Sequence, residues 1–258
     1  MRLLRSLCMA LTMYSKLPAP RVEWKEENMA YAMCFFPIVG VVIGALFIGL
    51  YFLGHALGLS SLLLAAVATV LPIAVSGGIH MDGFCDTLDA LSSHAPAEKK
   101  LEILKDPRAG AFAVIGCSTY LLLSFGFWHE ALGEGMHIYA LALVPVLSRA
   151  LSALAVVTFK GARKDGLLAA FRGAADVRCV RAVSALWVLL CGGAMAVLSP
   201  CAGGAALAAA GLTFLYYRIM AYREFGGATG DLAGFFVQIC ELACLAAAVL
   251  AGKIGGLI

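Results

Sequence analysis

Three aspartates stand close together in the stretch GGIHMDGFCDTLDA, residues 77–90, which lies between two long hydrophobic runs. Asp82, Asp86 and Asp89 follow one another at offsets of 4 and 7 from the first. A helix through them would therefore place all three carboxylates on one face, where like charges repel each other. Mg²⁺ relieves such repulsion, because it takes oxygen ligands and combines a few carboxylates with substrate phosphates. The spacing predicts a magnesium site at which these aspartates are metal ligands or catalytic groups.

The plainer interpretation of this stretch is a solvated acidic helix start, where carboxylates meet the positive end of the helix dipole. Three acids on one face beside an apolar segment favour a site, because charge near a bilayer core is costly and usually functional. Glycines at 77, 78 and 83 remove side chains, so that backbone or substrate can come close. His80, two residues before the first aspartate, is a candidate for substrate contact or for support of the metal ligands.

Cations follow in the stretch EKKLEILKDPRAGAF, residues 98–112. Its first part predicts an amphipathic helix over 98–105, and the KDPR sequence breaks it before the next hydrophobic run. Lys105 and Arg108 beside an acidic cluster fit a phosphate-bearing substrate held between cations. The alternative is that the pair is only the basic flank of a membrane span.

Two charges stand inside hydrophobic runs. Arg149 lies in VPVLSRALSAL, and a buried guanidinium needs an anionic partner. That partner is either an acid on another span or a substrate phosphate. Glu241 stands well inside the last hydrophobic run, where a bare carboxylate is unfavourable.

A glycine-rich stretch, FGGATGDLAG, precedes that last run at residues 225–234. Thr229 and Gly230 would give a flexible loop with backbone donors for a substrate, and Asp231 follows as a candidate base. Arg223 approaches the loop from the preceding segment. A glycine loop alone is weak evidence for a binding site. With Asp231 after it and Glu241 further along, the stretch predicts part of the same site as the aspartates.

The composition indicates what must position these groups. Of the 258 residues, 62% are hydrophobic and 14% are charged, against about 25% charged in soluble domains. A soluble domain cannot hide so much apolar surface. The net charge of +3 is too small to suggest nucleic acid, and the nine cysteines form no CxxC pair, which excludes a zinc ribbon or a disulfide framework.

Seven hydrophobic segments are long enough, or nearly so, to cross a bilayer. They run over residues 29–53, 59–76, 109–128, 137–157, 180–198, 202–216 and 232–250, the sixth being the weakest by length. The first contains a GxxxG at Gly40 and Gly44, which indicates close helix packing. An N-terminal helix ended by Pro18 and Pro20 should lie in the membrane interface. We therefore expect an all-α, polytopic membrane bundle of about seven spans, forming one domain over 1–258.

The connections between the segments alternate in charge. Lys and Arg gather in four of them: Arg2, Arg5, Lys16, Arg21 and Lys25; Lys99, Lys100, Lys105 and Arg108; Lys160, Arg163, Lys164, Arg172, Arg178 and Arg181; and Arg218 and Arg223. The intervening connections contain no Lys or Arg. Because basic residues are retained in the cytoplasm, this predicts a cytoplasmic N-terminus, an outer C-terminus and a site facing the cytoplasm.

Three stretches together resemble the cobalamin synthase family, also called adenosylcobinamide-GDP ribazoletransferase, over nearly the whole chain. The family's run of GG, His, DG and two further Asp matches at Gly77, Gly78, His80, Asp82, Gly83, Asp86 and Asp89. Its KD-x-R-x-G-x-F element matches at Lys105, Asp106, Arg108, Gly110 and Phe112, and its GG-x-TGD element at Gly226, Gly227, Thr229, Gly230, Asp231 and Gly234. Pro107, Glu224 and Ala228 depart from the family's usual residues.

The resemblance implies a Mg²⁺-dependent transferase of the bacterial or archaeal cytoplasmic membrane. It would join adenosylcobinamide-GDP to α-ribazole, or to its 5′-phosphate, and release GMP. On that reading Asp82, Asp86 and Asp89 hold the metal, one of them or Asp231 is the base, and Lys105, Arg108 and Arg149 hold phosphate oxygens. The lipid bilayer is then the main partner, and a homo-oligomer or a complex with other cobalamin-assembly enzymes is compatible with the sequence.

Two other functions have some support. A CDP-alcohol phosphotransferase of phospholipid synthesis uses a related acidic motif, but Asp86 stands where that motif has Ala, and no Arg follows. A transporter or channel could use Asp82, Arg149 and Glu241 along a permeation path. Transporter sites lie near the bilayer midplane, whereas most charges here gather in the connections of one side.

Overall fold

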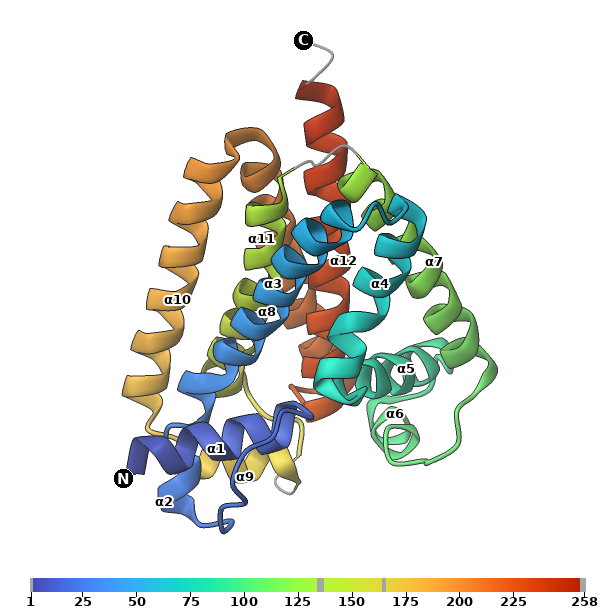
Figure 1. Cartoon of the computed structure of the whole chain (residues 1–258). Helices are drawn as coiled ribbons and strands as arrows, with labels where there is room; N and C mark the ends of the chain where they lie inside the picture. Colours follow the sequence, from blue (N-terminus) through green and yellow to red (C-terminus); the bar gives the residue numbers. More distant parts are fainter. Residues whose placement is uncertain (1, 134–136, 164–165, 256–258) are drawn as a thin grey trace.

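The computed structural model describes residues 2–133, 137–163 and 166–255, and these residues form twelve α-helices and no strand (Figure 1). The helices are α1 (Arg2–Tyr14), α2 (Glu26–Met29), α3 (Ala32–Ala56), α4 (Ser61–Ser76), α5 (Ile79–Ser92), α6 (Ala97–Ile103), α7 (Ala111–Gly133), α8 (Ile138–Thr158), α9 (Leu167–Ala174), α10 (Val177–Leu198), α11 (Pro200–Phe225) and α12 (Gly230–Gly255). The predicted all-α class is confirmed.

Six of these helices, α3, α7, α8, α10, α11 and α12, are each long and apolar enough to cross a membrane. A seventh crossing is counted only when α4 and α5 are taken together, and these two meet at a bend of 95°. Each predicted hydrophobic segment falls on one long helix or on α4. The sixth is longer than expected, because α11 continues through polar residues to Phe225, where Gly226 ends it in a left-handed conformation.

Helix α8 is the centre of the bundle, and nearly all of its residues are buried. It packs closely against α3, α10 and α12. A Cβ atom on Gly40 would overlap the carbonyl of Pro145, and one on Gly44 would overlap the carbonyl of Ala142. The GxxxG of α3 is therefore a packing surface for α8, as the sequence predicted.

The short helices gather at one end of the bundle, with α1, α2, α5, α6 and α9 at the bottom of Figure 1. The far end of α12 lies at the opposite end of the bundle. Helix α1 buries Cys8 and Met9 but exposes Leu3 and Leu4, which is typical of a helix that lies on a membrane. Its location in the interface stays a prediction, as does the cytoplasmic side. Lys164, one of the predicted basic residues, lies outside the described residues.

The corner between α4 and α5 determines where the aspartate stretch lies. Gly77 and Gly78 both have positive φ angles, 66° and 83°, which residues with a Cβ rarely adopt. The corner turns α5 across the end of the bundle instead of continuing α4. The next helices, α6 and α7, return the chain to the bundle beside it (Figure 1).

Candidate active site

The two glycine-containing motifs meet where α5 crosses the start of α12. A Cβ atom on Gly83 would lie 2.7 Å from the carbonyl oxygen of Asp231, and one on Gly234 would lie 3.1 Å from the carbonyl oxygen of His80. Only glycines allow the two backbones to come this close. Asp82, the neighbour of Gly83, is therefore brought to the same place as Asp231.

The carboxylates of this crossing influence one another. The residues from Asp82 to Asp89 are helical, as predicted, and the charges of Asp82, Asp231 and Asp89 all act on the partly buried Asp86. Asp82 and Asp231 line a cavity, whereas Asp86 is not among its lining residues. Within the described part of the chain, no three His, Cys, Asp or Glu side chains are arranged as a ready-made metal site.

Asp89 caps the start of α7. Its Oδ2 accepts a hydrogen bond from the backbone N–H of Gly110 at 2.6 Å, and its Oδ1 accepts one from Ala113 at 2.9 Å. These N–H groups belong to the start of α7, so that Asp89 satisfies donors that the helix leaves unpaired. The bonds attach the KDPRAG stretch to α5. Metal binding by Asp89 stays a prediction.

The predicted cations Lys105 and Arg108 do not line the cavity. Arg108 donates hydrogen bonds to Asp106 at 2.9 and 2.7 Å, and its side chain is 85% exposed. These bonds lower the pKa of Asp106 to about 2. Arg223 is also largely exposed, and it approaches Glu224 at 3.6 Å. Glu224 in turn pairs with the buried Lys100 at 2.5 Å, which joins α11 to α6.

Arg149 and Glu241, considered separately in the sequence, are partners in the structure. Nη1 of Arg149 donates to Oε1 of Glu241 at 2.6 Å and to the carbonyl of Pro145 at 3.0 Å. Oε1 of Glu241 also accepts a hydrogen bond from Ser148 at 2.8 Å. Of the two interpretations of Arg149, the structure shows the ion pair between spans; contact of either residue with substrate stays a prediction, and neither lines the cavity.

His80 belongs to the cavity wall and is only 5% exposed. Its ring packs against Phe36, with centroids 5.6 Å apart, and Phe36 in turn packs against Tyr14 at 4.4 Å. Nε2 of His80 is buried and has no hydrogen-bond partner. A buried polar atom without a partner is unfavourable, so this nitrogen suits a group that enters the cavity.

The glycine-rich stretch before α12, predicted as a flexible loop, is held in place by backbone hydrogen bonds. Gly161 and Ala228 form an isolated β-bridge. The N–H of Ala228 donates to the carbonyl of Lys160 at 2.8 Å, and the N–H of Ala162 donates to the carbonyl of Ala228 at 2.9 Å. A Cβ atom on Gly227 would lie 2.5 Å from the Lys160 carbonyl oxygen. The connection between α8 and α9 is thus tied to the turn that begins α12, a pairing that no sequence motif signalled.

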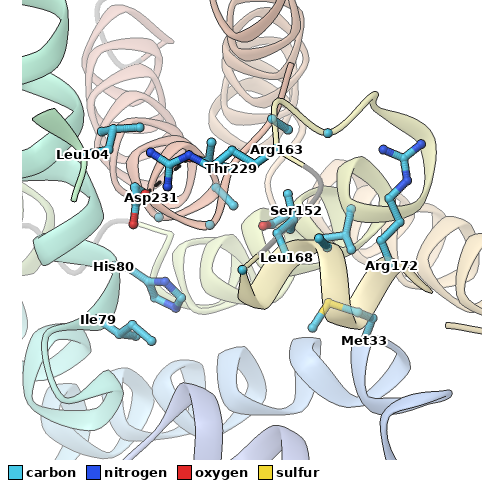
Figure 2. Close-up of a pocket in the computed structure, with 18 of the residues that line it drawn as sticks. Met33, Ile79, His80, Leu104, Ser152, Arg163, Leu168, Arg172, Thr229 and Asp231 are labelled. Carbon is cyan, nitrogen blue, oxygen red and sulfur yellow. Dashed lines mark hydrogen bonds between the residues drawn. The ribbon is translucent and has the colours of Figure 1, made fainter. Parts of the chain in front are cut away.

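These elements enclose a cavity of about 720 Å³ (Figure 2). Its acidic wall carries Asp82 and Asp231, with Thr229 and Gly230 beside them. Three cations also line the cavity, although in the sequence they indicated only the cytoplasmic side: Lys160, Arg163 and Arg172. Of the predicted site residues, the structure thus brings His80, Asp82, Thr229, Gly230 and Asp231 to one cavity.

The fold and the site define a polytopic helical membrane protein with a cavity at one end of the bundle, lined by carboxylates and cations. The family model for cobalamin-5-phosphate synthase matches residues 6–249 of the chain. The chain belongs to that family.

Several curated relatives are similar over almost their full length. The adenosylcobinamide-GDP ribazoletransferase of Lachnoclostridium phytofermentans is 46% identical, covering 97% of this chain and 95% of the relative. Those of Clostridium botulinum (strain Alaska E43) and Geobacillus kaustophilus are 31% and 34% identical, covering 96% and 89% of this chain and 98% and 89% of the relatives. No solved structure matches the chain.

Proposed function

We propose that this protein transfers the adenosylcobinamide phosphate moiety of adenosylcobinamide-GDP to α-ribazole, or to α-ribazole 5′-phosphate, and releases GMP. Family membership supports the reaction, because the relatives bear the name of this activity. The observation that carries the assignment of the site is the crossing of α5 and α12, where Gly83 and Asp231 are in backbone contact and Asp82 and Asp231 line one cavity.

The chemistry is a displacement at phosphorus. A ribose hydroxyl of the acceptor attacks the phosphorus attached to the cobinamide, and the bond to the bridging oxygen of the diphosphate breaks as GMP leaves. Asp82 or Asp231 orients this hydroxyl and takes its proton. Gly230 is the first residue of α12, a helix of 26 residues, and it lines the cavity. The positive end of the α12 dipole and its free N–H groups would therefore favour phosphate oxygens there.

Magnesium suits the donor set. The carboxylates offer hard oxygen ligands, and their charges act on Asp86 together. Mg²⁺ commonly takes one or two protein carboxylates and completes its shell with substrate phosphate and water. Asp82, with Asp86 and Asp231 beside it, would hold the ion. When bound, it would neutralise the negative charge that develops on the phosphate oxygens.

The protein would act in a bacterial or archaeal cytoplasmic membrane with its cavity facing the cytoplasm. The cavity lies at the end of the bundle that carries α1, α5, α6 and α9 (Figure 1), and the connections of this end hold the basic residues. This gathering of charge at one end argues against a transporter, whose site would lie near the midplane. The family match argues against phospholipid synthesis.

The test is a transfer assay with purified protein in detergent. We expect that adenosylcobinamide-GDP, α-ribazole and Mg²⁺ yield a cobamide and GMP, both resolved by chromatography, and that EDTA abolishes the reaction. CDP-diacylglycerol with an alcohol acceptor serves as the comparison substrate pair. Formation of phospholipid in place of a cobamide would refute the proposal, and activity that persists in EDTA would refute the role of the metal.

A further inference from the structure

The three cations that line the cavity are not explained by any of the three sequence motifs. Lys160, Arg163 and Arg172 come from the connection between α8 and α9 and from α9 itself, and all three line the cavity. No salt bridge with a carboxylate holds Lys160 or Arg172 within the described part of the chain. Cations that line a cavity without an acidic partner are suited to anionic ligands.

The two arginines lie at different parts of the cavity. Figure 2 shows the guanidinium of Arg163 beside Asp231, close enough for the two charges to interact. It also donates a hydrogen bond to the carbonyl of Leu101, which fixes its position. Figure 2 places Arg172 at the other side, beyond Leu168. One of its guanidinium nitrogens lies 3.5 Å from where a Cβ of Gly161 would be.

Packing and hydrogen bonds anchor the backbone next to each of these arginines. Phe171, next to Arg172, is 1% exposed and packs against Tyr14 and Trp24, with ring centroids 6.4 and 6.3 Å apart. On the other side, the bridge between Gly161 and Ala228 holds the connection against the start of α12. A binding group must be held in place to be effective, and these contacts position the backbone next to each arginine.

We propose that Arg163 and Arg172 form two separate anion subsites, one on each side of the cavity. Arg163, beside Asp231, binds the phosphate at which the displacement occurs. Arg172 binds a second phosphate group away from the acids. This inference rests on the proposed function, and it assigns new residues to that reaction. The second phosphate comes either from the acceptor, as a nucleoside 5′-phosphate, or from the nucleotide half of the donor.

The experiment compares Arg172→Gln and Arg163→Gln with Arg178→Gln. Arg178 is an exposed cation at the start of α10 that does not line the cavity, which makes it a matched control.

Steady-state kinetics are measured with α-ribazole and with α-ribazole 5′-phosphate. Arg172→Gln should raise one KM about tenfold or more, as the loss of a charge-assisted hydrogen bond predicts, with kcat little changed. Arg163→Gln should lower kcat by a similar factor, and Arg172→Lys should restore part of the loss.

The kinetic arms identify the source of the second phosphate. A rise in KM only for the phosphorylated acceptor assigns it to the acceptor, and a rise in the donor KM with either acceptor assigns it to the donor. Unchanged KM values for both substrates in Arg172→Gln, or equal losses in Arg178→Gln, would overturn the proposal.

A binding measurement separates this proposal from the proposed function. Isothermal titration with inorganic pyrophosphate requires no turnover, and the same three variants are used. Wild-type protein and Arg178→Gln should bind pyrophosphate at least tenfold more tightly than either cavity variant. Such a loss in a protein that shows no transfer activity would uphold the anion subsites while refuting the reaction. Equal binding by all proteins would refute the subsites even in an active enzyme.

Discussion

Nη1 of Arg149 lies 2.6 Å from Oε1 of Glu241, and this contact joins α8 to α12 in the interior of the bundle. Both residues are almost fully buried, with side chains 1% and 9% exposed. The guanidinium also lies over the ring of Phe36, whose neighbour His80 forms part of the cavity wall. The ion pair therefore supports the floor of the cavity from within the membrane-spanning helices.

Breaking this pair should destabilise the protein strongly. Glu241→Gln leaves the Arg149 charge without an anionic partner, and removal of one member of a buried pair typically costs about 3–5 kcal/mol. The free energy of unfolding, measured by denaturant titration in detergent, should fall by this amount. The double variant Arg149→Met with Glu241→Leu should recover most of the loss, because no charge then stays buried. If the loss of unfolding free energy in the double variant equalled the sum of the losses in the two single variants, the two side chains would not interact.

Neutralising the cavity acids should impair catalysis without unfolding the protein. Asp82→Asn and Asp231→Asn each keep the side-chain shape but remove the charge that orients the hydroxyl and holds the metal. Each should lower the transfer rate about 100-fold or more. The control is Glu98→Gln, an exposed acid of α6 away from the cavity lining. Full activity in either aspartate variant would remove that residue from the proposed mechanism.

The backbone contact of α5 with α12 should tolerate no side chain. Gly83→Ala would place a methyl group 2.7 Å from the Asp231 carbonyl oxygen, so that the two helices must separate. We expect a loss of about 1–3 kcal/mol in stability, as for other overpacked sites, and a larger loss of activity as Asp82 and Asp231 move apart. Gly49→Ala is the matched control in a membrane helix, because its Cβ would meet nothing within 4 Å. Equal effects of the two substitutions would contradict the crossing.

Asp89 should act mainly by holding the start of α7. Asp89→Ala removes the acceptor for the N–H groups of Gly110 and Ala113, and loss of such a cap typically costs about 0.5–2 kcal/mol. The Mg²⁺ concentration needed for half-maximal activity should change little. A tenfold increase in that concentration would instead show that Asp89 is a metal ligand, as the sequence spacing predicts.

Much of the fold followed from the sequence, because hydrophobic length and basic connections depend on local composition. The seven segments, the helix through Asp82 and the amphipathic helix near Glu98 were all predicted. An ion pair of Arg149 with an acid on another span was one of two interpretations, since a sequence shows that a buried charge needs a partner but not which one. Packing in three dimensions made that choice.

The cations that line the cavity could not be found in the same way. Arg163 and Arg172 lie in a connection rich in Lys and Arg, where the positive-inside rule alone explains their presence. The bridge of Gly161 with Ala228 brings this connection to the start of α12. Two residues make that bridge, and pairing so short leaves no periodic pattern in the sequence.

The corner at Gly77 and Gly78 also restricts insertions and deletions at the start of α5. An α-helix turns by about 100° for each residue, so that one residue inserted just after the corner would rotate the rest of α5 by that angle about its own axis. Gly83 would leave the surface of α12, and the carboxylate of Asp82 would point elsewhere. Insertions or deletions just after the corner should therefore reduce activity as strongly as replacement of the acids themselves. The neighbouring loops should tolerate such changes in length far better.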